Sequence, residues 1–343
     1  MINGVVSYAG GDNDDYVQLV DGLTPQDLEA MKSAFNTGDP SEGRDFIRDR
    51  YPRFFNYLFA EGRADWRFFI PLDNQSVVLD IGCGWGSLAC EIARESGSVY
   101  CVDASRSKLE FVQSRANAEQ LNALHTVHAD FLDGLPFPDR SFDLIVLNGV
   151  LEWAGVFRDE LTPESYQGRL LREARRVMKD GGHLYVGIEN RLGYWYFFGR
   201  EDEHAFTVFT TLMPRRVAGW VTWIVHRKPY RAYTYSMKQL EGLLKANGFG
   251  ACKILSSHPD YRNFKSLIEL ESSEPLAYYY ASLAKSELPA FSIRRLGRAL
   301  LKDRSAVLLL CLAPFARVFL RLVRKTGLMR HLVPSFSVVA RPE

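Results

Sequence analysis

Cysteine is scarce in this chain of 343 residues, and its placement argues against two kinds of site. The five cysteines are scattered, odd in number and form no Cys-x-x-Cys pair. Disulfide frameworks and structural zinc sites both need paired or closely spaced cysteines, so neither is predicted. Unpaired thiols of this kind are typical of a reducing compartment, and we expect a cytoplasmic protein.

Long hydrophobic runs are also missing. The longest apolar run, residues 306–316, has 11 residues and contains Pro314, whereas a membrane-spanning helix needs about 20. The start of the sequence is acidic and glycine-rich, without the basic residues and apolar core of a signal peptide. The sequence therefore predicts neither a membrane span nor a secretory leader.

Charge of one sign is in excess only locally. The formal net charge of +1 gives no ground for a nucleic-acid partner. Residues 291–330, however, contain ten basic residues against one acidic residue, and they flank the apolar run. This basic segment predicts either an amphipathic element in peripheral contact with an anionic membrane, or packed helices with a solvated basic face.

From residue 76 onward, short apolar segments alternate with helical patterns. Strands are predicted at 77–81, 98–102, 124–128, 142–147 and 183–188, and the helices between them at 87–96, 106–119 and 164–178. The last of these helices is expected to end at the glycines of the turn 179–182. This alternation is typical of an α/β fold with a doubly wound, Rossmann-like sheet, here preceded by a helical N-terminal region.

A glycine-rich turn, Asp80-Ile-Gly-Cys-Gly-Trp-Gly86, follows the first strand. Bare glycines at such a turn let a ligand lie against the backbone, where the next helix offers free N–H groups. Dinucleotides and S-adenosylmethionine (SAM) are both bound in this way, and a tight structural turn is a further interpretation. The dinucleotide fingerprint is G-x-G-x-x-G, and the glycine spacing here differs from it.

The turn resembles the D/E-x-G-x-G-x-G motif of class I SAM-dependent methyltransferases of the type 11/25 kind. Three later segments resemble the same family: the strand ending at Asp103, the stretch His128-Ala-Asp-Phe131, and residues 135–146, LPFPDRSFDLIV. The resemblance covers residues 76–188 and implies SAM as the cofactor. The residues that it implies in SAM binding are Asp80, Gly82, Cys83, Gly84, Gly86, Asp103, Asp130, Phe131 and Asn148.

Each of these residues has an expected role in the family. The glycine backbone approaches the methionine half of SAM, Asp80 orders the loop, and Asp103 accepts both ribose hydroxyls. Asp130 accepts from the adenine amino group with Phe131 against the ring, and Asn148 lies beside the amino acid part. An acid at the position of Asp103 is shared with NAD enzymes and could also cap the next helix, so it does not discriminate.

The resemblance also implies a seven-stranded sheet of order 3-2-1-4-5-7-6, with strand 7 antiparallel. Strands 6 and 7 are then residues 251–256 and 335–341, with a basic helical insertion at about 258–334 between them. The expected organisation is an N-terminal extension and helical cap (1–75), the SAM-binding core (76–188), an aromatic acceptor-side insertion (189–235) and the C-terminal part of the core (236–343).

Candidate catalytic residues follow strands 4 and 5, because this fold binds its ligands at the carboxyl ends of the strands. Glu152 is either a functional acid or an acid at a helix start. His204 ends the acidic patch Glu201-Asp-Glu-His204 and is either a general base or a surface histidine. The patch lacks metal-ligand spacing, so no metal is predicted. With residues 188–193, IENRLG, it resembles a subgroup of bacterial methyltransferases associated with glycan and secondary-metabolite assembly.

Aromatic residues gather after strand 5, at 194–198 and 220–223. We expect them to pack a lid onto the core, with a stacking surface for a sugar or aromatic acceptor as the alternative. The leading hypothesis is a SAM-dependent methyltransferase that O-methylates a glycan, lipid-linked glycan or small metabolite. N- or C-methylation, an NAD-dependent oxidoreductase and a non-catalytic SAM-binding accessory protein are the alternatives.

Overall fold

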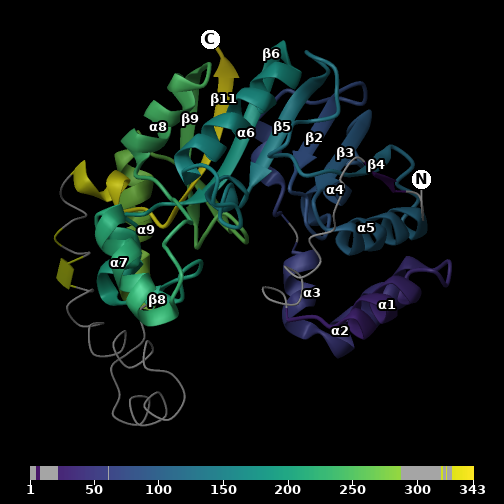
Figure 1. Cartoon of the computed structure of the whole chain (residues 1–343), viewed down its shortest axis with the longest axis horizontal. Helices are drawn as coiled ribbons and strands as arrows, with labels where there is room; N and C mark the ends of the chain where they lie inside the picture. The colour runs from purple at the N-terminus through teal and green to yellow at the C-terminus, as the bar shows by residue number, and fades with distance from the viewer. Residues whose placement is uncertain (1–4, 8–21, 61, 287–317, 320–321, 323–326) are drawn as a thin grey trace.

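The computed structural model describes residues 5–7, 22–60, 62–286, 318–319, 322 and 327–343. Within this part of the chain, nine strands form one sheet of order β1-β4-β3-β2-β5-β6-β11-β9-β10 (Figure 1). The strands are β1 (Val6–Ser7), β2 (Val77–Ile81), β3 (Ser98–Asp103), β4 (Leu124–His128), β5 (Phe142–Asn148), β6 (Met178–Glu189), β9 (Phe249–His258), β10 (Ser266–Glu269) and β11 (Ser335–Pro342).

The predicted strand order is confirmed for the seven central strands. Order 3-2-1-4-5-7-6 corresponds to β4-β3-β2-β5-β6-β11-β9, and β11 is antiparallel to both β6 and β9. The predicted number of strands is wrong, because β1 adds to β4 in parallel and β10 adds to β9 in antiparallel fashion. Strands of two and four residues are too short to show the alternation on which the sequence prediction depended.

Helices cover both faces of the sheet, and each face has its own apolar core. The helices α6 (Pro163–Val177) and α8 (Met237–Ala246) pack on one face, with Leu79 pointing into that core. The helices α4 (Ser87–Ile92) and α5 (Arg106–Ala118) pack on the other face, with Val78 pointing into theirs. Val78 and Leu79 belong to different cores because successive side chains of a strand point to opposite faces of the sheet.

The predicted end of α6 is wrong in one detail. The helix ends at Val177, and Met178 is already extended and begins β6. Gly181 and Gly182 therefore lie within the strand and do not form a helix C-cap. A Cβ at Gly182 would meet Met178 Cγ at 2.6 Å. Close packing against the first residue of the same strand therefore accounts for this glycine.

The N-terminal helices pack against the second core. They are α1 (Pro25–Ala34), α2 (Pro40–Arg50), α3 (Pro52–Leu58) and the 3-10 helix η2 (Asp65–Phe69). Trp66 of η2 is fully buried and stacks on Tyr185 of β6, with ring centroids 3.6 Å apart.

In Figure 1 the arrowhead of β11 is at the top, so the parallel strands end at the lower edge of the sheet. The helix α3 lies near this edge.

The segment after β6 also gathers at the lower edge. It contains η4 (Tyr194–Phe198), β7 (Glu201–Asp202), β8 (Thr207–Val208), η5 (Thr210–Leu212) and α7 (Arg215–His226). Tyr194, Trp195 and Tyr196 are buried against Tyr280 of α9 (Ser273–Ser286), as expected of a packed lid. The same expectation is wrong for the aromatic residues of α7, because Trp220 and Trp223 are 66% and 52% exposed.

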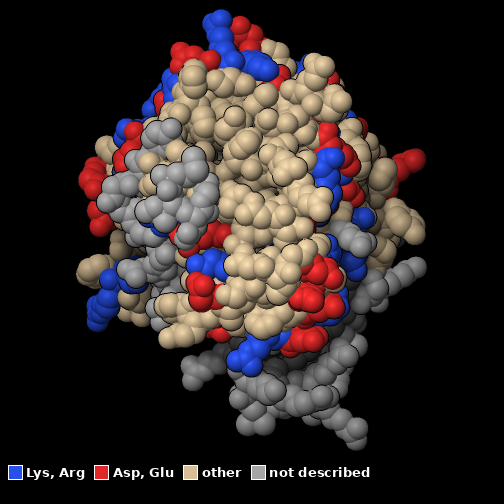
Figure 2. All heavy atoms as spheres, turned by 90° about the vertical axis from the view of Figure 1, so that its right-hand side faces the viewer, with Lys and Arg blue, Asp and Glu red and all other residues tan. Residues whose placement is uncertain are grey.

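Most of the basic segment 291–330 lies outside the described residues, so its two predicted readings stay predictions. Among the residues that are described, none of the helices is both long and apolar enough to cross a membrane. On the face that carries α5 and the N-terminal helices, acidic and basic side chains are intermixed (Figure 2). Among the described residues seen on this face, there is no broad patch of one sign.

Candidate active site

The glycine turn between β2 and α4 has the conformation that its sequence predicts. Gly82, Gly84 and Gly86 have φ values of +67°, +54° and +70°, a region that glycine occupies without steric cost. A side chain at Gly82 would meet Val150 at 2.7 Å. At Gly84 a Cβ would find nothing within 4 Å, so this residue leaves open space beside the backbone. Space of this kind is what a ligand lying against the turn requires.

Asp103 stabilises this turn from the end of β3. One carboxylate oxygen accepts the Gly84 N–H at 2.8 Å, and the other accepts the Ser105 N–H at 2.9 Å. Ser105 itself is the N-cap of α5 and accepts from the Lys108 N–H. The alternative in which Asp103 is the helix cap is therefore wrong, and its role in binding the ribose stays a prediction.

Asp80 is buried at the end of β2, and its surroundings change its acidity. Burial raises the pKa of Asp80 to about 7, against the opposing field of Arg63, and Asp103 adds to the increase. Arg63 comes from the segment between α3 and η2, is 5% exposed, and lies over the Tyr57 ring at 4.2 Å. Its Nε has no hydrogen-bond partner in the described part of the chain. Sequence analysis missed Arg63, since no local motif marks it.

The remaining predicted cofactor residues lie after β4 and β5. Asp130 accepts from Arg158 at 2.6 Å and from the Leu132 N–H at 3.0 Å, so both of its oxygens already have partners. Phe131 is half-buried against the first core. Asn148 Oδ1 is buried and has no partner among the described residues. The contact with Arg158 was not predicted, and it competes with the expected contact between Asp130 and adenine.

These residues fit a SAM molecule at the carboxyl edge of β2, β3 and β5. The open space beside Gly84 would take the methionine half, and the unpartnered amide oxygen of Asn148 could accept from its amino group. Cys83 is half-buried, and burial raises the pKa of its thiol well above the usual range, so it stays protonated. The approach of the Cys83 backbone to SAM stays a prediction.

The two predicted catalytic residues are brought together by the fold. Glu152 lies in η3 (Leu151–Trp153), directly after β5, and is fully buried. Its Oε1 is 4.0 Å from His204 Nε2, and the His204 side chain is only 3% exposed. The Trp153 ring packs on the imidazole at 4.8 Å between centroids. The alternative of a surface histidine is therefore wrong.

A short hairpin positions His204. The strands β7 and β8 pair, and His204 lies in the turn between them. Asp202 Oδ1 accepts the His204 backbone N–H at 2.9 Å and lies 3.1 Å from Nδ1. The other Asp202 oxygen accepts from Thr210 at 3.1 Å. With Nδ1 held by a carboxylate, Nε2 is the nitrogen left to face Glu152.

Tyr261, from the loop after β9, connects two carboxylates. Its hydroxyl lies 3.2 Å from Glu152 Oε1 and 3.2 Å from Glu189 Oε1, at the end of β6. The second oxygen of each glutamate is buried without a partner among the described residues. Gly149 allows this arrangement, because a Cβ there would meet the Tyr261 hydroxyl at 2.7 Å. Sequence analysis did not identify Tyr261 as a member of this cluster.

The charges of this buried cluster are compensated by protons. Burial and the charge of Glu189 raise the pKa of Glu152 to about 8. Burial alone would lower the pKa of His204, but the hydrogen bond to Asp202 and the surrounding carboxylates raise it to about 9. Ligand atoms of Glu152, Glu189 and His204 lie within 4.8 Å of one another, so the cluster also has the composition of a cation site.

The neighbours of Glu189 have structural roles. Asn190 donates to the carbonyls of His331 and Val333, and Arg191 donates to the carbonyls of Thr211 and Met213. The Asn190 bonds hold the end of β6 to the chain that precedes β11, and the Arg191 bonds hold it to the residues around η5. The IENR motif thus contributes one residue, Glu189, to the cluster.

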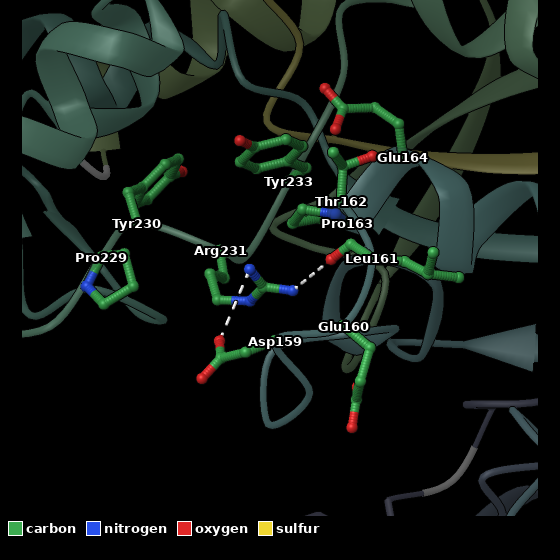
Figure 3. Close-up of a pocket in the computed structure, with 10 residues that line it drawn as sticks. All are labelled: Asp159, Glu160, Leu161, Thr162, Pro163, Glu164, Pro229, Tyr230, Arg231 and Tyr233. Atoms are coloured by element: carbon green, nitrogen blue, oxygen red, sulfur yellow. Dashed lines mark hydrogen bonds and ion pairs between the residues drawn. The ribbon is translucent and has the colours of Figure 1, made fainter.

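A pocket of about 410 Å³ lies between the start of α6 and the segment before α8 (Figure 3). It is lined by residues 159–164, before and at the start of α6, and by Pro229, Tyr230, Arg231 and Tyr233. Arg231 crosses between the two segments and donates to the Leu161 carbonyl at 2.8 Å. Tyr230 also hydrogen-bonds Asp202, so the pocket wall contacts the residue that holds His204.

Comparison with known proteins supports the assignment of the core. Residues 79–186 match the family model described as a methyltransferase domain. The chain is 34% identical over 112 residues to methyltransferase GfsG of Streptomyces halstedii, covering 32% of this chain and 36% of that relative. It is 31% identical to a demethylmenaquinone methyltransferase of Listeria welshimeri, covering 40% of this chain and 57% of the relative. The matches thus span about a third to somewhat over half of these relatives.

A further relative matches over more of its length, and one solved structure is also similar. A demethylmenaquinone methyltransferase of Symbiobacterium thermophilum is 26% identical over 64% of this chain and 90% of the relative. A putative methyltransferase from Bacillus halodurans is 18% identical, with a TM-score of 0.41, covering 82% of this chain and 99% of that one. Residues 79–186 are therefore a class I SAM-dependent methyltransferase domain, with S-adenosylmethionine as its cofactor.

Proposed function

We propose that the whole chain is a SAM-dependent O-methyltransferase and that His204 is its general base. The observation that carries this proposal is the contact of His204 Nδ1 with Asp202, which leaves Nε2 as the free nitrogen beside Glu152. The cluster follows β5 and β6 at the carboxyl edge of the sheet, where this fold brings its ligands together.

The proposed reaction is a single displacement. The acceptor hydroxyl oxygen attacks the methyl carbon of SAM, the bond from that carbon to sulfur breaks, and S-adenosylhomocysteine leaves. The hydroxyl proton passes to His204 Nε2, and Asp202 stabilises the imidazolium that forms. Glu152 places a carboxyl group close to this nitrogen. The chain's further contribution is to hold oxygen and methyl group in line.

We propose a glycan, lipid-linked glycan or small metabolite with free hydroxyls as the acceptor. The pocket of Figure 3 supports this, because it combines the faces of Tyr230 and Tyr233 with charged groups at Glu164 and Arg231. Aromatic faces pack against apolar C–H surface, and carboxylates and guanidinium groups exchange hydrogen bonds with hydroxyls. N- and C-methylation remain the alternatives, and identification of the methylated atom distinguishes them from O-methylation.

The test measures SAM binding and methyl transfer separately. His204→Gln should bind SAM normally by calorimetry but lose methyl transfer from labelled SAM into an extract by about a hundredfold or more. The matched control is His125→Gln, an exposed histidine of β4, which should behave as the unmodified protein. Full transfer by His204→Gln would refute the base, and label recovered on nitrogen or carbon would refute O-methylation.

The cofactor residues are tested by Asp103→Ala. Loss of its hydrogen bonds to Gly84 and to the ribose should weaken SAM binding about ten- to hundredfold. Asp139→Ala, whose side chain is 72% exposed, is the control and should leave the affinity unchanged. Equal SAM affinity for Asp103→Ala and unmodified protein would remove the ribose assignment.

A further inference from the structure

The helix α7 presents an exposed apolar stripe to solvent. Trp220 is 66% exposed, Trp223 52%, Ile224 50% and Val217 44%. The opposite side of the helix is attached to the protein through the buried residues Ala218 and Thr222. Two tryptophans exposed on one helix are unusual, because their large surfaces normally lie in a core or an interface.

The exposed residues share one face of the helix. At about 100° per residue, Val217, Trp220, Trp223 and Ile224 fall within an arc of about 120°. Arg216, which is exposed, falls inside the same arc, and the exposed Arg227 follows the last turn as the C-cap of the helix. The stripe therefore begins and ends with a basic residue. Figure 1 places α7 at the periphery, away from the N-terminal helices.

Basic charge on this face is unopposed within the described part of the chain. Arg216, Arg227 and Lys228 take part in no ion pair found there, and α7 itself contains no acidic residue. Arg215, on the attached side, is instead paired with Glu164 at 2.6 Å. An apolar stripe with tryptophans and flanking basic residues has the composition of a helix that lies in a membrane interface.

We propose that α7 docks on the surface of an anionic membrane. Its tryptophans would lie at the level of the headgroups, and Arg216, Arg227 and Lys228 would contact lipid phosphates. The helix has 12 residues and is too short to span a bilayer, so it lies in the plane of the interface. This inference depends on α7 alone and does not require the proposed acceptor.

Docking in this orientation would also place the pocket of Figure 3 close to the bilayer. Arg215 contacts Glu164 and lies over the Tyr233 ring at 3.7 Å, and both of these residues line the pocket. The helix and the pocket are thus attached to each other through one side chain. An acceptor carried by a lipid could reach the pocket from the membrane surface.

The test is flotation of the full-length protein with vesicles of phosphatidylcholine, with and without phosphatidylglycerol. The unmodified protein should float with the anionic vesicles and remain behind with the neutral ones. The double variant Trp220→Ser, Trp223→Ser should bind at least about tenfold less. The triple variant Arg216→Gln, Arg227→Gln, Lys228→Gln should bind on the order of a hundredfold less.

The matched control is Phe68→Ser, which removes an aromatic side chain that is 71% exposed outside α7. It should float as the unmodified protein does. Circular dichroism of every variant shows that loss of flotation does not reflect unfolding. Equal flotation of the tryptophan variant would overturn the proposal and assign membrane contact to another part of the chain. No flotation at all, or equal flotation on neutral vesicles, would overturn it as well.

Discussion

At the scale of single residues, the active-site cluster makes activity and stability depend on pH in opposite directions. His204 has a pKa of about 9, so at pH 7 about one molecule in a hundred holds the neutral imidazole that the reaction needs. Methyl transfer should therefore increase about tenfold per pH unit from pH 7 and level off near pH 9. A pH–rate profile under saturating SAM measures this, and a flat profile would contradict the role of His204.

The free energy of unfolding should instead decrease as the pH rises. The pKa values of His204 and Glu152 are both raised by folding, so the folded protein binds more protons than the unfolded chain up to about pH 9. Stability from these groups is fully present at low pH and is lost as the pH rises through 8 and 9. The melting temperature should fall over this range, and His204→Gln should reduce the slope. If the melting temperature fell with pH just as steeply in His204→Gln, groups other than His204 would be responsible for the fall.

The protons on Glu152 and His204 also affect whether this cluster can bind a metal ion. Glu152 and His204 hold protons near neutral pH, and a divalent cation at these atoms would have to displace both. We therefore expect methyl transfer at pH 7 to survive treatment with EDTA unchanged. Loss of activity that Mg²⁺ or Mn²⁺ restores would instead make Glu152, Glu189 and His204 a cation site.

At the scale of elements, the loop after β5 depends on a single glycine. Gly149 has a φ of +72°, and a Cβ there would meet the Tyr261 hydroxyl at 2.7 Å. Gly149→Ala should destabilise the protein by about 1–3 kcal/mol and lower methyl transfer, because Tyr261 must leave the two glutamates. Thermal unfolding and labelled-SAM assays measure both effects.

The control for this substitution is Gly242→Ala in the middle of α8. A Cβ at Gly242 has nothing within 4 Å, and its backbone is helical. Alanine should stabilise that helix by about 0.5–1 kcal/mol. If both substitutions gave the same change in melting temperature, close approach of Tyr261 would not explain Gly149.

The elements that sequence analysis predicted well are those with local signals. The glycine turn, β2 and Asp103 could be placed because strand, turn and helix follow one another within about 25 residues. Glu152 and His204 were selected singly, as polar residues after strands. That they meet could not be predicted, because the β7–β8 hairpin is too short to show a pattern.

Other features depend on contacts between distant segments. Tyr261 reaches the cluster across more than a hundred residues, and Arg158 reaches Asp130 from the far side of β5. Arg63 lies beside Asp80 only because the N-terminal helices fold back over the sheet. For α7, sequence analysis noted the aromatic residues at 220–223 but predicted neither the helix nor its exposed side. Residue spacing predicts which side chains share one face of a helix. Only the tertiary structure shows whether that face contacts the core or solvent.

At the scale of the whole molecule, β11 holds the sheet together. It pairs with both β6 and β9, so it connects the methyltransferase core to the strands of the C-terminal part. A variant lacking residues 335–343 should fail to fold, since both neighbours lose a full ladder of hydrogen bonds and Phe336 leaves the core. Circular dichroism and solubility test this, with removal of Glu343 alone as the control. A cooperative melt of the shorter chain would show that β11 is dispensable.

The position of β11 also sets an order of events during synthesis. The strand β9 leaves the ribosome well before its partner, because roughly 75 residues separate them along the chain, and at about 5–20 residues per second this takes several seconds. In that interval β6 and β9 each have an open edge, to which strands of other chains could add. The nascent protein is thus exposed to aggregation until β11 has been synthesised, so slow translation of residues 259–334 should lower the yield of soluble protein.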